Sequence, residues 1–252
     1  MEFFDTRLRA RLEQIQKQAE EIQGWLNPWA GAMLYLLARY FAPADLAVVE
    51  LGAWKGRSAL WLASALDDRG AGLLHSIDTW EGTANEAVHH QLLRDYDKDG
   101  LYREFLGNLR GAHLDSRVRP WRMDTQAAAR AWAERAEPIG LLFIDADHDY
   151  EAVKADFAAW SPFVAKGGFV VFDDVPNWPG PTRLVSRLPA DFDWVVAPPG
   201  HWTVVRGDGT PCRERLQSCL ETVRGLLPKK TQGARWRARY RKLLRRLSPV
   251  AR

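Results

Sequence analysis

The chain has 252 residues, of which 46% are hydrophobic and 27% are charged, and its formal net charge is +3. These proportions are typical of a soluble globular protein. The longest apolar stretch, Trp29 to Ala38, is about half as long as a membrane-spanning helix, and the charged N-terminus lacks the apolar core of a signal peptide. The two cysteines, Cys212 and Cys219, do not form a disulfide framework or a metal-ligand pattern. We therefore expect a cytoplasmic protein.

The first 45 residues are expected to form an N-terminal helical extension. Residues 3 to 23 are polar with sparse apolar positions, which is typical of an exposed amphipathic helix. A second, more apolar helix is expected from Pro28 to about Phe41. Proline fits the first turn of a helix because its missing N–H would be unpaired there anyway.

From residue 46 to residue 207, short apolar runs alternate with helical stretches. Such alternation favours a parallel sheet covered on both faces, with right-handed connections. The sequence therefore predicts a Rossmann-like α/β domain: a doubly wound, mostly parallel, seven-stranded sheet with helices on both faces. The expected strands cover residues 47–51, 73–77, 118–123, 139–144, 169–172, 193–196 and 202–205, and the expected helices cover 58–66, much of 84–112, 125–135 and 150–163.

Acidic residues follow or end each of the first five expected strands. Ligands of doubly wound sheets bind outside the carboxyl ends of the strands, so these positions indicate a binding site. The acids concerned are Glu50, Asp78, Asp124, Asp145 with Asp147, and Asp173 with Asp174.

The first motif is the turn from Glu50 to Ser58, which reads ELGAWKGRS. Gly52 permits a tight turn, and Gly56 permits close approach of the next helix. Trp54 occupies the place of the middle glycine of the nicotinamide fingerprint, so that fingerprint is absent. Glu50 would repel a pyrophosphate and suits a ligand with an ammonium group. The alternative is an ordinary turn between a strand and a helix.

The second motif is Asp78 in SIDTWEG, at the end of the second expected strand. An acid in this place of a Rossmann-like domain accepts hydrogen bonds from ribose hydroxyls. The alternative is that Asp78 is a helix cap or a turn residue.

The third motif, FIDADHDY, brings Asp145 and His148 to the carboxyl end of a buried strand. Imidazole accepts protons near neutral pH, so His148 is the expected general base. Asp147 could instead cap the following helix, and we assign that role to Asp149.

The fourth motif is the pair Asp173 and Asp174 at the end of GGFVVFDDV. Adjacent carboxylates repel each other unless a positive group lies between them. Mg²⁺ prefers one or two carboxylates together with water and substrate oxygens, so Asp145 with Asp174, and also Asp173, would suit it. The alternative is hydrogen bonding of these carboxylates to loop amides.

Together, VVELGAWKGRS, HSIDTWEG, FIDADHDYEAVKADFAAW and GGFVVFDDV resemble the class I S-adenosylmethionine-dependent methyltransferases. The chain is most similar to the subgroup of macrocin and mycinamicin sugar O-methyltransferases and cephalosporin-hydroxylase-like proteins. The resemblance covers roughly residues 24 to 205. It implies metal-assisted O-methylation of a hydroxylated small molecule or saccharide.

The resemblance also implies roles for individual residues. Mg²⁺ would be bound by Asp145, Asp173 and Asp174, and His148 and Asp145 would be catalytic. Residues 84 to 115 would form part of a lid over the acceptor, with Trp80 and Trp178 as ring contacts. S-adenosylmethionine would be bound by Glu50 and Gly52 at its methionine end, by Asp78 at the ribose and by Asp124 near the adenine, within the set Glu50, Gly52, Ala53, Gly56, Ser58, Asp78, Thr79, Trp80, Asp124, Thr125 and Asp145.

Other functions stay open at this point. Trp54 stands where the wider superfamily commonly has glycine, and no motif identifies the acceptor. The alternatives are N-methylation without a metal, a nicotinamide-binding oxidoreductase, and a non-catalytic relic that keeps the cofactor pocket. A homo-oligomer is also compatible with the sequence.

Residues 208–252 are expected to form a basic, helical tail. Ten Lys or Arg residues and no acid lie between Lys229 and Arg252, which leaves 25 basic and 32 acidic residues elsewhere, a balance of −7. Residues 235 to 247 place apolar side chains on one face of a helix and cations on the other. Such a helix could bind the inner membrane surface or the acidic body of a dimer partner. The alternative is a frayed helix that is exposed to solvent. Nucleic acid is the least favoured partner.

Overall fold

The computed structural model of the chain describes residues 6–82 and 87–226. The basic segment from Lys229 onward, with the helix expected over 235–247, lies outside the described residues. No helix in the described part combines the length and the apolarity that crossing a membrane requires.

The described residues contain a seven-stranded sheet with the strand order β3-β2-β1-β4-β5-β7-β6. The pairs among the first five strands are parallel, whereas β7 pairs antiparallel with both β5 and β6. The predicted Rossmann-like fold is therefore confirmed. The strands are β1 (Ala47–Leu51), β2 (Leu74–Asp78), β3 (Val118–Arg122), β4 (Ile139–Ile144), β5 (Val164–Val175), β6 (Phe192–Val196) and β7 (Gly200–Arg206).

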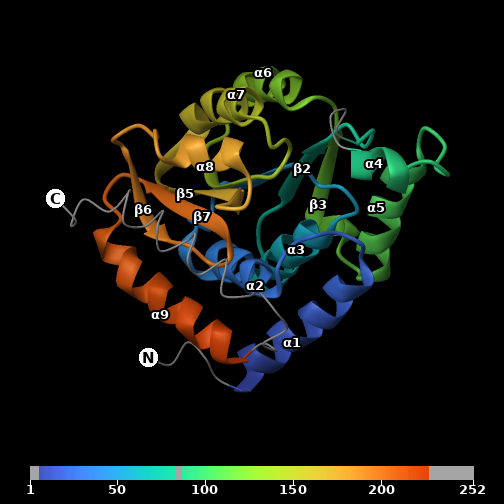
Figure 1. Cartoon of the computed structure of the whole chain (residues 1–252). Helices are drawn as coiled ribbons and strands as arrows, with labels where there is room; N and C mark the ends of the chain where they lie inside the picture. The colour runs from blue at the N-terminus through green and yellow to red at the C-terminus, as the bar shows by residue number, and fades with distance from the viewer. Residues whose placement is uncertain (1–5, 83–86, 227–252) are drawn as a thin grey trace.

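Helices cover both faces of this sheet (Figure 1). The helices are α1 (Thr6–Glu21), α2 (Pro28–Leu36), α3 (Arg57–Arg69), α4 (Ala87–Leu92), α5 (Gly100–Gly111), α6 (Thr125–Arg135), α7 (Tyr150–Trp160), α8 (Pro179–Val185) and α9 (Thr210–Leu226). A π-helical turn (Leu37–Phe41) continues α2, and short 3-10 turns cover Asp115–Arg117 and Ser161–Phe163. The expected helix over 84–112 is therefore two helices joined by a loop.

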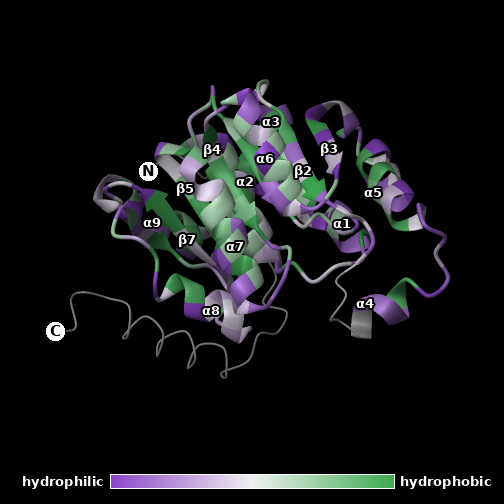
Figure 2. Cartoon of the chain, turned by 90° about the horizontal axis from the view of Figure 1, so that it is seen from above, coloured by the Kyte–Doolittle hydropathy of each residue, from purple (hydrophilic) through white to green (hydrophobic). Residues whose placement is uncertain are grey.

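Two apolar cores lie on opposite faces of the sheet, because successive side chains of a strand point to opposite faces. Val48 packs in the core shared with α1, α2, α3, α5 and α9, whereas Val49 packs in the core shared with α6, α7 and α8. The central strand β4 and helix α2 are coloured mainly hydrophobic in Figure 2, and α4 and α5 at the edge carry much hydrophilic surface.

Three elements differ from the expectation. β5 begins at Val164 and ends at Val175, so it is longer than the predicted 169–172. Helix α8 was not predicted, because its sequence PGPTRLV carries two prolines. Helix α9 is part of the folded body: Leu216 and Val223 are buried, and Arg213 pairs with Asp193 of β6 at 2.7 Å.

Candidate functional site

A cavity of about 950 Å³ opens at the carboxyl ends of the parallel strands. Its walls come from the turn after β1, the ends of β2, β4 and β5, the start of α6, and the loop from Gly24 to Asn27. This volume is at the upper end of the range for small-molecule sites. The predicted residues that line it are Gly52, Ala53, Ser58, Asp78, Thr79, Asp124, Thr125, Asp145, His148, Asp173 and Asp174.

The turn after β1 has an unusual backbone, with positive φ values at Gly52 (83°), Trp54 (47°) and Gly56 (91°). A Cβ on Gly52 would lie 2.1 Å from the carbonyl oxygen of Asp145, so β4 approaches too closely for any side chain. The turn is therefore restricted to glycine at Gly52 both by its backbone and by its surroundings.

Asp78 holds this turn from the end of β2. Its Oδ2 accepts hydrogen bonds from the backbone N–H groups of Ala53 (2.8 Å) and Trp54 (2.9 Å), and its Oδ1 accepts one from Trp80 (2.6 Å). Burial raises the pKa of Asp78, and these hydrogen bonds oppose that rise. The predicted turn role of Asp78 is thus present, and its carboxylate also lines the cavity.

Glu50, Gly56 and Trp80 do not line the cavity. Glu50 is fully buried beneath the turn, where the Ser76 hydroxyl donates to its Oε2 at 2.7 Å. Burial raises the pKa of Glu50 to about 7. Gly56 faces Phe105, and Trp80 is buried against the same ring, because α5 packs behind the turn.

Asp124 caps helix α6 by accepting the N–H groups of Gln126 and Ala127. Thr125 and Gln126, the next two residues, donate to Asp156 of α7 at 2.5 and 2.7 Å. Burial raises the pKa of Asp156 to about 6. Asp156 lines the cavity but carries no motif, so sequence reasoning missed it.

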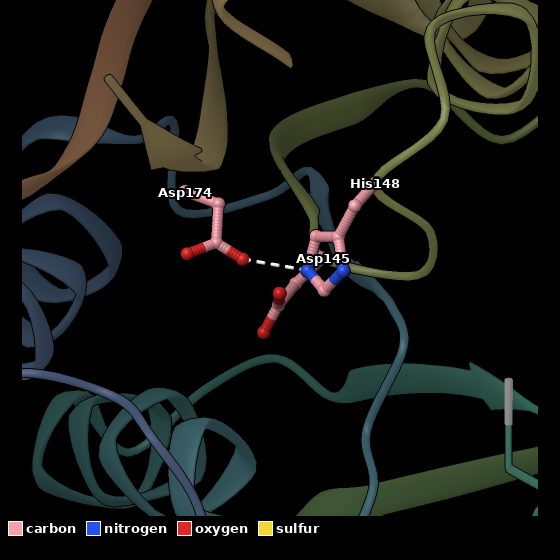
Figure 3. A group of neighbouring side chains, drawn as sticks. All are labelled: Asp145, His148 and Asp174. Carbon is pink, nitrogen blue, oxygen red and sulfur yellow. Dashed lines mark ion pairs between the residues drawn. The ribbon is translucent and has the colours of Figure 1, made fainter. Parts of the chain in front are cut away.

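Asp145, His148 and Asp174, which follow or end β4 and β5, face one another (Figure 3), and all three line the cavity. One potential ligand atom from each of the three lies within 4.8 Å of the others, so a metal ion could contact all of them. The His148 Nε2 lies 2.6 Å from the Asp174 Oδ2. Asp174 has a positive φ of 58°, a conformation that is uncommon for a residue other than glycine.

Repulsion and burial govern the charge of these carboxyls. Burial, followed by the neighbouring Asp173 and Asp174, raises the pKa of Asp145 well above its ordinary value. Burial also raises the pKa of Asp174, although the hydrogen bond from His148 opposes the rise. A cation bound between these carboxyls would offset their mutual repulsion and favour their ionised forms.

Asp173 has a different partner from the other two carboxyls. Its Oδ1 lies 3.1 Å from the Nε2 of His201 on β7, a side chain that is 1% exposed. Burial raises the pKa of Asp173, but His201 outweighs it and holds the pKa below its ordinary value. The sequence indicated only that His201 precedes the expected strand 202–205, because its pairing with Asp173 depends on β7 lying beside β5.

Aromatic side chains border the cavity. The Trp178 ring stacks on His148 at 4.3 Å with an angle of 11° between the rings, and Trp178 is 43% exposed. On the other side, Trp54 stacks on His89 of α4 at 4.5 Å, and Trp25 packs against both. The predicted lid segment therefore reaches the cavity through His89.

The sheet and the cavity at its carboxyl edge define a Rossmann-like α/β ligand-binding domain. Residues 49–175, just over half of the chain, match the family described as "Methyltransferase domain", and the chain belongs to this family. A curated relative, uncharacterized protein R132 of Acanthamoeba polyphaga mimivirus, is 28% identical over 159 residues, which are 62% of this chain and 65% of the relative. The chain thus matches less than two thirds of that relative's length.

Solved structures show the same fold. The O-methyltransferase NovP is 18% identical with a TM-score of 0.52, over 79% of this chain and 80% of NovP. The O-methyltransferase from Bacillus cereus in complex with SAH is 17% identical, with a TM-score of 0.50 over 81% of this chain and 93% of that one. The SAH-bound Podospora anserina methyltransferase PaMTH1 is 14% identical, with a TM-score of 0.52 over 81% and 89%. The predicted methyltransferase class is thus confirmed at the level of family and fold.

Proposed function

We propose that the protein transfers a methyl group from S-adenosylmethionine to a hydroxyl group of a small molecule or saccharide. The observation that carries this proposal is the cavity itself. It brings the turn held by Asp78 and the group Asp145, His148 and Asp174 into one space, in which Gly52 of the turn lies directly beside Asp145. The family membership and the shared fold with SAH-bound methyltransferases support the choice of methyl donor.

The carboxylates that line the cavity fit S-adenosylmethionine. Asp78 and Asp124 present carboxylates beside the turn, where acceptors for ribose and adenine groups are needed. Seven carboxyl side chains line the cavity, at residues 78, 124, 145, 147, 156, 173 and 174, so the site suits a ligand with positive charge. Arg57 also lines the cavity, and its Nε donates to the Ile22 carbonyl oxygen. When bound, S-adenosylmethionine supplies an electrophilic methyl group.

The side chains at the ends of β4 and β5 can bind and deprotonate the acceptor. His148 would take the proton of the hydroxyl group as a general base, and Asp174 would stabilise the resulting imidazolium through the contact at 2.6 Å. Trp178 fixes the plane of the imidazole by stacking on it. Holding the acceptor oxygen and the donor together in one cavity would supply much of the rate by orientation.

A divalent cation fits the same place. Asp145 and Asp174 would hold Mg²⁺, with Asp173 as the third carboxylate, since oxygen ligands of this kind suit a hard cation. Such an ion lowers the pKa of a hydroxyl group that binds to it. His201 would keep Asp173 charged and in place.

Calorimetric titration with S-adenosylhomocysteine in a Mg²⁺ buffer tests the donor. We expect one-to-one binding with a dissociation constant in the micromolar range, about −8 kcal/mol. NADH in the same buffer is the control for the oxidoreductase alternative. If S-adenosylhomocysteine releases no heat and causes no thermal shift at millimolar concentration, the proposal is wrong.

The catalytic roles need a second experiment with a labelled methyl donor and a panel of hydroxylated acceptors. His148→Ala should lose at least about 100-fold in turnover while keeping its affinity for S-adenosylhomocysteine. EDTA should abolish turnover of a metal-assisted O-methyltransferase and leave a metal-free N-methyltransferase active. Normal turnover of His148→Ala would remove His148 as the base.

A further inference from the structure

The turn after β1 is held in its unusual conformation by side chains that lie outside it. Asp78 accepts two of its N–H groups, as described above. Its carbonyl groups are held from the other side: Trp80 Nε1 donates to the Trp54 oxygen at 2.9 Å, and Asn108 Nδ2 donates to the Lys55 oxygen at 2.8 Å. Asn108 belongs to α5, so this helix takes part in shaping the turn.

Lys55 ties the same turn to the same helix. Its side chain is 8% exposed, and its Nζ lies 3.2 Å from Glu104 Oε2 of α5. The Nζ also donates to the Tyr96 hydroxyl at 2.7 Å, and Tyr96 in turn donates to Glu104. Lys55 does not line the cavity, so it cannot act by touching a ligand there.

Apolar packing joins the two parts further. A Cβ on Gly56 would lie 3.1 Å from the fully buried Phe105 ring of α5, so the turn and the helix are in close contact. On the cavity side, Trp54 stacks on His89 of α4. The segment 87–111, which carries α4 and α5, therefore contacts the turn from two directions (Figure 1).

We propose that Lys55 and its α5 partners Glu104 and Asn108 are positioning residues for the methyl donor. They hold the conformation of the turn from the side that faces α5. Binding of the methyl donor is thereby coupled to the packing of residues 87–111 against the turn. The inference rests on the proposed function, because it assumes that the turn binds the donor. Coupling is reciprocal, so the donor must also stabilise the docked helix if the helix favours the donor.

Lys55→Met tests the ion pair. It keeps much of the aliphatic stem and removes the charge, while Glu104 is 34% exposed and can be hydrated in the variant. We expect its affinity for S-adenosylhomocysteine to fall at least tenfold in calorimetry well below the unfolding temperature. Glu104→Gln should also weaken binding, and Lys55→Met/Glu104→Gln should weaken it by less than the two single effects multiplied.

Asn108→Ala tests the same inference without removing a charge. Alanine favours a helix more than asparagine does, so α5 itself should not be weakened. We expect at least a fivefold loss of affinity, together with faster amide hydrogen exchange in residues 100–111 of the S-adenosylhomocysteine complex. In the wild type, adding S-adenosylhomocysteine should slow exchange of these amides.

Arg39→Met is the matched control. Arg39 pairs with Asp68 at 3.0 Å near the far end of α3, so its loss also removes a partly buried ion pair but leaves the turn alone. Its affinity should stay within twofold of the wild type. If Lys55→Met and Asn108→Ala bind as tightly as the wild type, the positioning role is refuted. Failure of the wild type to bind would refute the proposed function instead.

Discussion

Glu50 is a carboxyl that folding removes completely from water. Because burial raises its pKa to about 7, the folded protein binds this proton more tightly than the unfolded chain, where the ordinary value is 4.5. The contribution of the protonated Glu50 carboxyl to the free energy of unfolding is therefore fully present below about pH 4.5 and is lost as the pH rises through 7. The loss amounts to about 3 kcal/mol at most.

Glu50→Gln should remove this pH dependence, since the amide is neutral and can still accept the hydrogen bond from Ser76. Urea unfolding between pH 5 and 8 measures it: the difference in unfolding free energy between variant and wild type should grow in favour of the variant as the pH rises. Carboxyls remote from Glu50 titrate equally in both proteins and cancel, whereas Asp78 and Asp145 interact with Glu50 electrostatically and contribute to the difference. A difference that stays constant with pH would show that Glu50 is not the titrating group.

Gly52 allows a second prediction at the residue scale. Gly52→Ala should destabilise the fold by about 2 kcal/mol or more, because the new Cβ meets the Asp145 oxygen and the φ of 83° disfavours a side chain. Gly107→Ala is the control, since Gly107 lies in α5 with open space around it, and it should be neutral or slightly stabilising. Urea denaturation measures both; equal stabilities of the two variants would contradict the close approach of β4.

At the residue scale, the sequence indicated the acids at the strand ends but not their partners. Asp145 and Asp174 could be predicted to meet, because parallel strands end at the same edge of a sheet. The contacts of His201 with Asp173 and of Asp156 with Thr125 could not be predicted, since His201 lies on β7 and Asp156 in a helix interior without a motif. Lys55 looked like an ordinary turn residue, because its contact with Glu104 spans 49 positions of chain.

Helix α9 shows what element-scale reasoning could and could not reach. The many cations after Lys229 suggested that residues 208–252 form a tail with a partner of its own. That interpretation overlooked the apolar positions of α9, which are fewer and lie before Lys229. In the structure, these positions pack on β6 and α2 and close one of the two cores.

Leu216 lies at the centre of this packing and is fully buried. Leu216→Ala should lower the free energy of unfolding by about 2–5 kcal/mol, because it leaves a cavity between α9 and the sheet. The neighbouring Gln217 is exposed, so Gln217→Ala should change stability by less than about 0.5 kcal/mol. Chemical denaturation compares the two, and a loss below about 1 kcal/mol for Leu216→Ala would mean that α9 contributes little to the fold.

At the scale of the whole molecule, the alternation of strands and helices was sufficient to predict the layers of the fold. Short apolar runs such as Ile139–Ile144 are buried on both faces, and such runs are easy to recognise. The length of β5 was harder, since Lys166, Gly167 and Gly168 interrupt its apolar pattern. The order of the last two strands depends on tertiary pairing and could not be read from the pattern.

Ligand binding to a single cooperative domain should raise its melting temperature. S-adenosylhomocysteine at 100 times its dissociation constant should add about 2.7 kcal/mol of stability, which corresponds to about 5–10 °C for a domain of this size. Thermal denaturation monitored by fluorescence would detect the shift, and NADH at the same concentration should leave the melting temperature unchanged. A similar rise with NADH would favour the oxidoreductase alternative.

The antiparallel strand β7 lies between β5 and β6, although it is the last strand in the chain. During synthesis, the twelve-residue β5 therefore has an open edge until residues 200–206 have left the ribosome. A chain stopped at residue 199 would display that apolar edge permanently, and open edges of this kind pair with other chains. The hairpin of β6 and β7 thus covers the edge of β5 and also places His201 beside Asp173.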